Sequence, residues 1–182
     1  MSAVSLGIIG KGNEPLYLRD FSGATTVDDA ALFGLTSDED GGTTSSFSPT
    51  STISLRQEFI LHAALDRFVQ VNGPPPGFAW RHNVTPTTTD DPQFVGLLGP
   101  WEDWLVYGWM TTTQIKFLVA LQDNGEDTKQ NAAGLLRQLH KLYVEYRLNP
   151  LGPLTGPIVS KRFDEKVRQT IEGYNNQQRM VW

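Results

Sequence analysis

The stretch Trp104–Leu121, WLVYGWMTTTQIKFLVAL, decides the fold class of this 182-residue chain. It contains two strand-like segments, residues 104–111 and 114–121, joined by a threonine-rich link. Both faces of each strand are apolar: Trp104, Val106 and Met110 oppose Leu105, Tyr107 and Trp109, while Ile115, Phe117, Val119 and Leu121 oppose Lys116, Leu118 and Ala120. An antiparallel sheet with one solvated face would alternate apolar and polar residues. The stretch therefore predicts a sheet that is covered by helices on both sides.

The residues before this stretch predict three further strands and a helix. Residues 6–10 and 16–21 are typical of an N-terminal hairpin, and residues 93–98 of a third strand. The helix starts near Ser54, which fits a capping box with Gln57. It ends before the two glycines and three prolines of residues 73–77.

The residues after the stretch predict two more helices. The first is capped by Asp127 or Thr128 and stops at Asn149-Pro150, because a residue before proline disfavours the helical conformation. The second is capped by Ser160. The predicted order is therefore β-β-α-β-β-β-α-α. It is an α+β fold with a five-stranded antiparallel sheet, one helix on one face and two on the other.

Residues 1–182 are predicted to form one domain, which is long enough for a substantial core. Residues 22–52 are rich in Ser, Thr, Gly and Asp and contain no Lys or Arg. We interpret them as an acidic low-complexity insertion. Residues 72–92 are interpreted as a Pro/Thr-rich loop.

Composition excludes several classes of function. The acidic insertion accounts for the formal net charge of −5, so the rest of the chain has no basic field for nucleic acid or anionic lipid. The absence of cysteine excludes disulfides and thiol chemistry and fits a cytosolic protein. The N-terminus has no signal-peptide pattern and the apolar runs are strand-sized. We therefore expect a cytoplasmic protein with no nucleic-acid partner and no direct membrane insertion.

The residues that could carry chemistry do not form a recognisable site. No two of the three histidines have metal-ligand spacing, and no cysteine could complete a site. His62 and Asp66 are one helical turn apart, but no nucleophile or oxyanion stabiliser is evident beside them, so an interface or surface pair is the better interpretation. Residues 7–12 fit a hairpin turn better than a phosphate loop. His140 is expected to be solvated. We predict no catalytic residue, no metal and no cofactor.

The first helix carries two apolar stripes. Its wider arc, typical of a core face, contains Ile60, Leu61, Ala64, Leu65, Phe68 and Val71. A second, mixed stripe contains Leu55, Phe59, His62, Ala63 and Asp66. A helix in a small domain needs only one buried face, so another protein could cover this second stripe. The alternative is that a loop of the same chain covers it.

Several motifs together resemble the sedlin family, which comprises small subunits of the TRAPP vesicle-tethering complex. The segments 13–17 and 59–66 are similar to the first hairpin and first helix of that family. The segments 96–109 and 115–117 look closer to its paralogous 2-like branch. The Asn149-Pro150 junction and residues 163–167 match both branches. The resemblance covers nearly the whole chain except residues 22–52, residues 78–92 and the tail.

This resemblance implies a longin-like fold and a non-catalytic adaptor. TRAPP is a guanine-nucleotide exchange factor for Rab GTPases in ER–Golgi and Golgi transport. A subunit of the TRAPP II type would join the small-subunit core to a large subunit, contact the Rab indirectly, and lie peripherally at Golgi, ER–Golgi or endosomal membranes. Asp66 matches the family aspartate that is important for large-subunit contact.

Two alternatives share this kind of fold. One is a longin-type module that binds a SNARE or a Rab GTPase directly. The other is a small-molecule sensor, which would need a ligand-sized internal cavity.

Overall fold

A computed structural model describes residues 3–21, 51–52, 55–72, 91–101, 104–122, 128–150, 152–153 and 156–180. The strands are β1 (Ala3–Ile9), β2 (Pro15–Asp20), β3 (Ser51–Thr52), β4 (Phe94–Trp101), β5 (Trp104–Met110) and β6 (Lys116–Gln122). The helices are α2 (Leu55–Asn72), α3 (Thr128–Arg147) and α4 (Lys161–Met180). The strands form one sheet in the order β3-β2-β1-β6-β5-β4.

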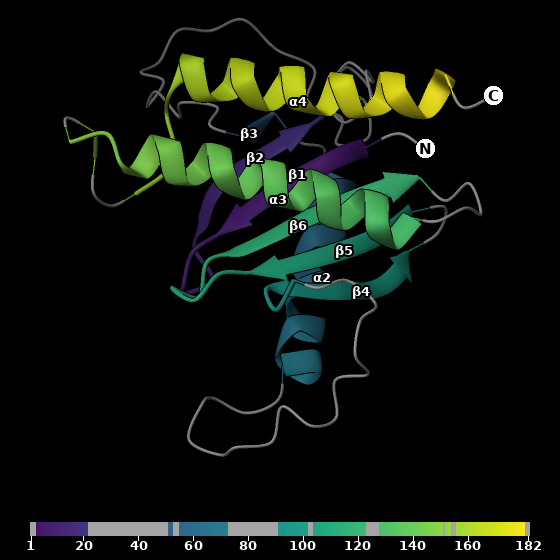
Figure 1. Cartoon of the computed structure of the whole chain (residues 1–182). Helices are drawn as coiled ribbons and strands as arrows, with labels where there is room; N and C mark the ends of the chain where they lie inside the picture. The colour runs from purple at the N-terminus through teal and green to yellow at the C-terminus, as the bar shows by residue number, and fades with distance from the viewer. Residues whose placement is uncertain are drawn as a thin grey trace, which may run out of the picture.

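The described elements form three layers. Helix α2 lies on one face of the sheet, and α3 and α4 lie side by side on the other (Figure 1). The predicted α+β class, the five antiparallel strands and the one-and-two distribution of helices are confirmed.

The short strand β3 was not predicted. It pairs in parallel with β2 and places Ser51 opposite Leu18 and Thr52 opposite Arg19. We had assigned these two residues to the acidic insertion, because a two-residue Ser-Thr strand has no hydrophobic period to reveal it.

The stretch that predicted the layers divides its side chains as expected. Antiparallel pairing sets Trp104 opposite Gln122 and Met110 opposite Lys116. On the α2 side, the buried residues of the two strands are Val106, Leu118 and Ala120. On the α3–α4 side, they are Tyr107, Trp109, Phe117, Val119 and Leu121. Both faces of the sheet are therefore core.

Glycines let α2 approach the sheet closely. A Cβ added at Gly108 in β5 would lie 2.7 Å from Cζ of Phe68 and 3.0 Å from Cδ1 of Leu98. A Cβ at Gly7 in β1 would lie 3.2 Å from Cδ1 of Leu61. These distances are shorter than ordinary contacts, so the side chains of α2 occupy space that any larger residue would need.

The turn between β1 and β2 is a tight hairpin, as predicted. The Gly10 amide donates to the Glu14 carbonyl at 2.8 Å, and the Asn13 amide donates to the Gly10 carbonyl at 3.2 Å. Asn13 has a φ of 65°, a left-handed conformation that asparagine tolerates better than most residues. A phosphate loop would need to lead into a helix, and this turn leads into β2.

Helices α3 and α4 bury the predicted stripes. Leu135, Leu136, Leu139 and Tyr143 of α3, and Phe163, Val167, Ile171 and Tyr174 of α4, are buried. Leu142 and Tyr146 are partly buried against the same core. The cap at Ser160 is confirmed, because its Oγ accepts from the Phe163 amide at 3.3 Å. Helix α4 continues to Met180, beyond Gln177, where we had expected a frayed tail.

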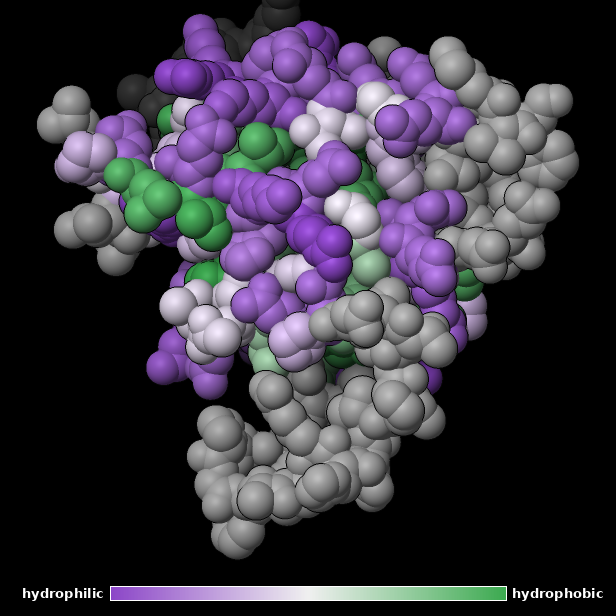
Figure 2. Space-filling model, viewed as in Figure 1, coloured by the Kyte–Doolittle hydropathy of each residue, from purple (hydrophilic) through white to green (hydrophobic). Residues whose placement is uncertain are grey.

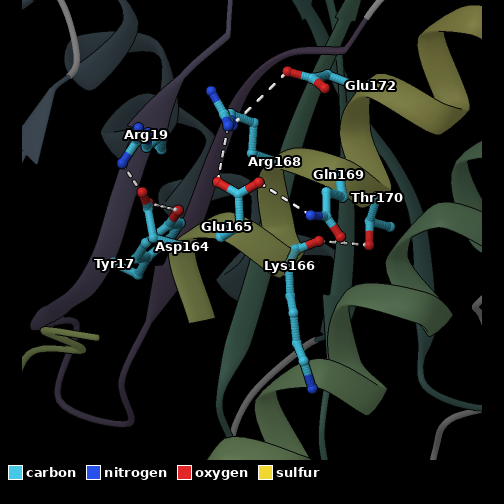
Figure 3. Close-up of polar contacts among 9 residues, drawn as sticks. All are labelled: Tyr17, Arg19, Asp164, Glu165, Lys166, Arg168, Gln169, Thr170 and Glu172. Carbon is cyan, nitrogen blue, oxygen red and sulfur yellow. Dashed lines mark hydrogen bonds and ion pairs between the residues drawn. The ribbon is translucent and has the colours of Figure 1, made fainter. Parts of the chain in front are cut away.

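A polar contact ties the start of α4 to β2. Oδ1 of Asp164 accepts a hydrogen bond of 2.7 Å from the Tyr17 hydroxyl and forms an ion pair with Arg19 (Figure 3). Burial and the neighbouring Asp164 carboxylate raise the pKa of Tyr17, so its hydroxyl stays protonated and can donate. Asp164 lies in the first turn, where the helix dipole also favours a carboxylate.

The expectation that His140 is solvated was only partly right, because the residue is half-buried. Its ring centroid lies 5.9 Å from that of Trp109 and 5.8 Å from that of Phe117. Burial lowers the pKa of His140 below its ordinary value. The wheel of α3 placed this residue on a polar arc, but the wide aromatic rings of β5 and β6 extend beneath that arc.

Some predictions lie outside the described residues. They are the Ser54 cap, the Asp127 cap, residues 22–50 of the insertion and residues 73–90 of the loop. These features, and the assignment of residues 1–182 to a single domain, stay predictions.

We expect Gly108→Ala to lower the free energy of unfolding by about 1–3 kcal/mol, because the added methyl group overlaps Phe68. Gly134→Ala is the control. Its Cβ would meet nothing within 4 Å, so it should raise the free energy of unfolding by about 0.5–1 kcal/mol. Urea titration of both variants measures the difference, and equal stabilities would contradict the close packing of α2.

We expect stability to fall as pH decreases through the ordinary titration range of histidine. The pKa of His140 is lowered by burial, so the unfolded chain binds more protons there than the folded one. The free energy of unfolding therefore rises with pH, and the stabilising contribution of neutral His140 is fully present above that range. Thermal unfolding between pH 5 and pH 8, as bracketing conditions for a histidine, should show a smaller pH dependence in His140→Phe than in the natural chain. An identical pH dependence in both proteins would refute the assignment to His140.

Candidate protein-binding surface on helix α2

Helix α2 has one face in the core and one face in solvent. Five of the six residues of the predicted inner arc are buried and pack over β4, β5 and β6: Ile60, Leu61, Ala64, Leu65 and Phe68. The side chain of Val71, the sixth, lies outside the described part of the chain. On the opposite side, Phe59 is 71% exposed. His62 and Asp66 are exposed as well, and Ala63 is half-buried. We call Phe59, His62, Ala63 and Asp66 the outer α2 surface.

The outer α2 surface lies on the side of α2 away from the sheet, and Phe59 and Asp66 are exposed within the described part of the chain. Leu55, the fifth residue of the predicted stripe, begins the helix, but its side chain lies outside the described part of the chain. The structure therefore brings four of the five predicted residues together on one accessible face.

The spacing of these residues explains why they form one surface. Positions 59, 62, 63 and 66 follow the i, i+3, i+4, i+7 pattern of a single helix face. Ala63 lies in the middle, with the ring of Phe59 one turn before it and the carboxylate of Asp66 one turn after it. A small residue between two larger ones gives a partner element room to approach the helix.

The charges on this face are unevenly satisfied. Nε2 of His62 lies 3.8 Å from Oε1 of Glu58, a contact that is an ion pair only when the histidine is protonated. Within the described part of the chain, Asp66 takes part in no ion pair and no hydrogen bond. Asp66 is therefore the residue of this face whose charge a partner could satisfy.

The geometry disfavours catalysis at the same residues. His62 pairs with Glu58 in the preceding turn, and the described residues show no His62–Asp66 pair that could act as a base and its orienting group. The described residues also contain no cluster of three His, Cys, Asp or Glu side chains that could hold a metal ion.

One exposed apolar feature was missed by sequence reasoning. Leu148 and Val159 are each 75% exposed in the connection between α3 and α4. Figure 2 shows a hydrophobic patch beside this connection on an otherwise mostly hydrophilic face. A signal was present for Val159. A hydrophobic residue directly before a helix cap often packs against the fourth residue of the helix. For Val159, which precedes the Ser160 cap, that fourth residue is the polar Asp164, so no such contact is expected.

Comparisons with known proteins relate nearly the whole chain to one family. The sequence profile of the family described as Sedlin matches residues 8–172, which include all of α2. The trafficking protein particle complex subunit 2-like protein of Dictyostelium discoideum is 26% identical over 168 residues, which cover 92% of this chain and 95% of that relative.

Vertebrate relatives match over a shorter stretch. The proteins of the same name from Xenopus tropicalis and Rattus norvegicus are 33% and 32% identical over 75 residues. These matches cover 41% of this chain and 54% of each relative.

We expect Phe59→Ala to leave the free energy of unfolding within about 0.5 kcal/mol of the natural value, because the side chain is exposed. Leu61→Ala, two residues along the same helix, removes a buried side chain and should cost about 2–5 kcal/mol. Chemical denaturation compares the two variants. A large loss for Phe59→Ala would mean that the chain itself covers the outer α2 surface.

Proposed function

Because this chain belongs to the sedlin family, we propose that it is a non-catalytic adaptor subunit of the TRAPP complex, bound to other subunits through the outer α2 surface. The relatives that it matches carry the name of a trafficking protein particle complex subunit. The observation that carries the choice of surface is the accessibility of Phe59 and Asp66 on a helix whose other face is core.

The chemistry of the surface defines what a partner should offer. Phe59 would enter an apolar pocket, since an exposed aromatic ring gains most from a fully desolvated site. Asp66 would accept hydrogen bonds from an Arg or Lys of the partner, because burying an unpaired carboxylate at an interface has a large desolvation cost. Ala63 lies between them and would let the partner backbone come close.

We further propose that this partner is a large TRAPP subunit and that other faces of the domain meet the small-subunit core. In this proposal the complex is of the TRAPP II type, acts in ER–Golgi and Golgi transport, and engages its Rab GTPase through other subunits. The chain would be cytoplasmic and peripheral at Golgi, ER–Golgi or endosomal membranes. Among the described helices, none is long and apolar enough to cross a bilayer.

We expect Asp66→Tyr to leave the domain folded and to abolish binding to the large subunit, because the substitution removes the charge and adds a bulky ring at an exposed position. The measurement is affinity purification of the tagged chain from cells, with quantitative mass spectrometry of all co-purified TRAPP subunits. Phe59→Ala should weaken the same contact by about 2 kcal/mol, the loss typical of a buried hot-spot residue.

Matched controls lie on the opposite side of the sheet. Glu172→Tyr makes the same kind of change at an exposed acidic residue of α4, and Leu148→Ala truncates another exposed apolar residue. Both should still recover the large subunit normally, because neither residue lies on the outer α2 surface. Normal recovery of the large subunit with Asp66→Tyr would refute the proposed surface. Tight binding of the isolated chain to a Rab or a SNARE would instead favour a longin-type module that binds it directly.

A further inference from the structure

A polar groove runs between α3 and α4, on the face of the sheet opposite α2. It has a volume of about 350 Å³, and none of the described residues that line it is charged. Leu135 and Tyr174, both buried in the core, also line it. The two helices are antiparallel, so the N-terminal half of α3 lies beside the C-terminal half of α4 (Figure 1).

Both walls of this groove carry the same short motif. Helix α3 contributes Gln130, Gly134 and Gln138, and helix α4 contributes Gln169, Gly173 and Gln177. Residues four apart share one helix face and are separated by about 6 Å along the axis. Each wall therefore presents two amide side chains with a glycine between them, and the antiparallel helices repeat this order in opposite directions.

The fold itself does not require the two glycines. A Cβ added at Gly134 or at Gly173 would meet nothing within 4 Å, and neither residue has a positive φ. Glycine inside a helix is less favourable than alanine, because it loses more backbone freedom on folding. Two such positions facing one open groove are explained if the backbone of another chain has to approach the helices closely.

The amide side chains of the groove can make further hydrogen bonds. Each carries an NH2 group that can donate to a backbone carbonyl and a carbonyl oxygen that can accept from a backbone N–H group. Within the described part of the chain, Gln130, Gln138 and Gln177 make no hydrogen bond through their side chains. Gln169 donates its Nε2 to Oε1 of Glu165 at 3.0 Å, which leaves its carbonyl oxygen to accept (Figure 3).

We propose that the groove binds an extended, uncharged peptide segment of a partner protein, with the glutamines hydrogen-bonding its backbone and the glycines allowing its close approach. The two amides of each wall are eight residues apart, about 12 Å along the helix axis, which is close to the roughly 13 Å that four residues of an extended chain span. The absence of charge among the described lining residues favours a segment without Lys, Arg, Asp or Glu at the positions that face the groove. The inference does not depend on the outer α2 surface.

The test uses a phage library of random twelve-residue peptides, selected on the full chain. Enriched peptides are synthesised, and their dissociation constants are measured for the natural chain and for Gly134→Leu with Gly173→Leu, which fills the groove. We expect at least a tenfold increase in the dissociation constant for the filled variant. Bound peptide should shift the NMR signals of the Gly134 and Gly173 amides and of the glutamine side chains.

The control variant is Lys141→Leu with Glu172→Leu, which changes exposed residues of the same helices outside the groove. It should change the dissociation constant by less than twofold. Gly134→Ala with Gly173→Ala should raise the melting temperature and also raise the dissociation constant of the peptide. This result would separate loss of binding from loss of folding. The proposal is overturned if no enriched peptide depends on the groove, if the peptides shift signals of α2 instead, or if the chain dimerises through α3 and α4.

Discussion

Burial of both faces of β5 and β6 is the constraint on which the rest of this structure depends. Leu118 and Ala120 point toward α2, and Phe117 and Val119 point toward α3 and α4. Neither face could be exposed without placing large apolar side chains in water, so both must be covered. The two faces are covered unequally, by one helix on one side and by two antiparallel helices on the other (Figure 1).

This inequality has consequences for function. Among the described elements, no other helix or strand packs against the outer side of α2, and the outer α2 surface is the result. On the other face, α3 and α4 each cover part of the other helix but leave a groove between them, which is lined mainly by glutamines and glycines. The two surfaces lie on opposite sides of the sheet. A small domain of this architecture can therefore contact two partners without overlap, which suits a subunit that joins parts of a larger assembly.

Much of the fold could be predicted, because the main signals are local or periodic. Side-chain alternation identified the two core faces of β5 and β6, and the Asn149-Pro150 and Ser160 signals marked the boundary between α3 and α4. The expectation for His140 failed because its burial depends on Trp109 and Phe117, which belong to other elements. Strand β3 was missed because backbone pairing with β2 requires no particular side chain. Helical spacing alone placed four residues of the candidate surface on one face of α2, and their role in binding stays a prediction.

The sequence by itself determined the layers, the order of the elements other than β3 and the two stripes of α2, since hydrophobic burial leaves a period in the residue pattern. It also contained the family resemblance, which the profile match over residues 8–172 bears out. Only the tertiary structure decided that Phe59, His62 and Asp66 of the second stripe are exposed among the residues that it describes. It also decided that Asp66 stands apart from the His62–Glu58 contact and that the motifs of α3 and α4 face one groove. These facts depend on how distant segments pack against one another, which no local period of residues records.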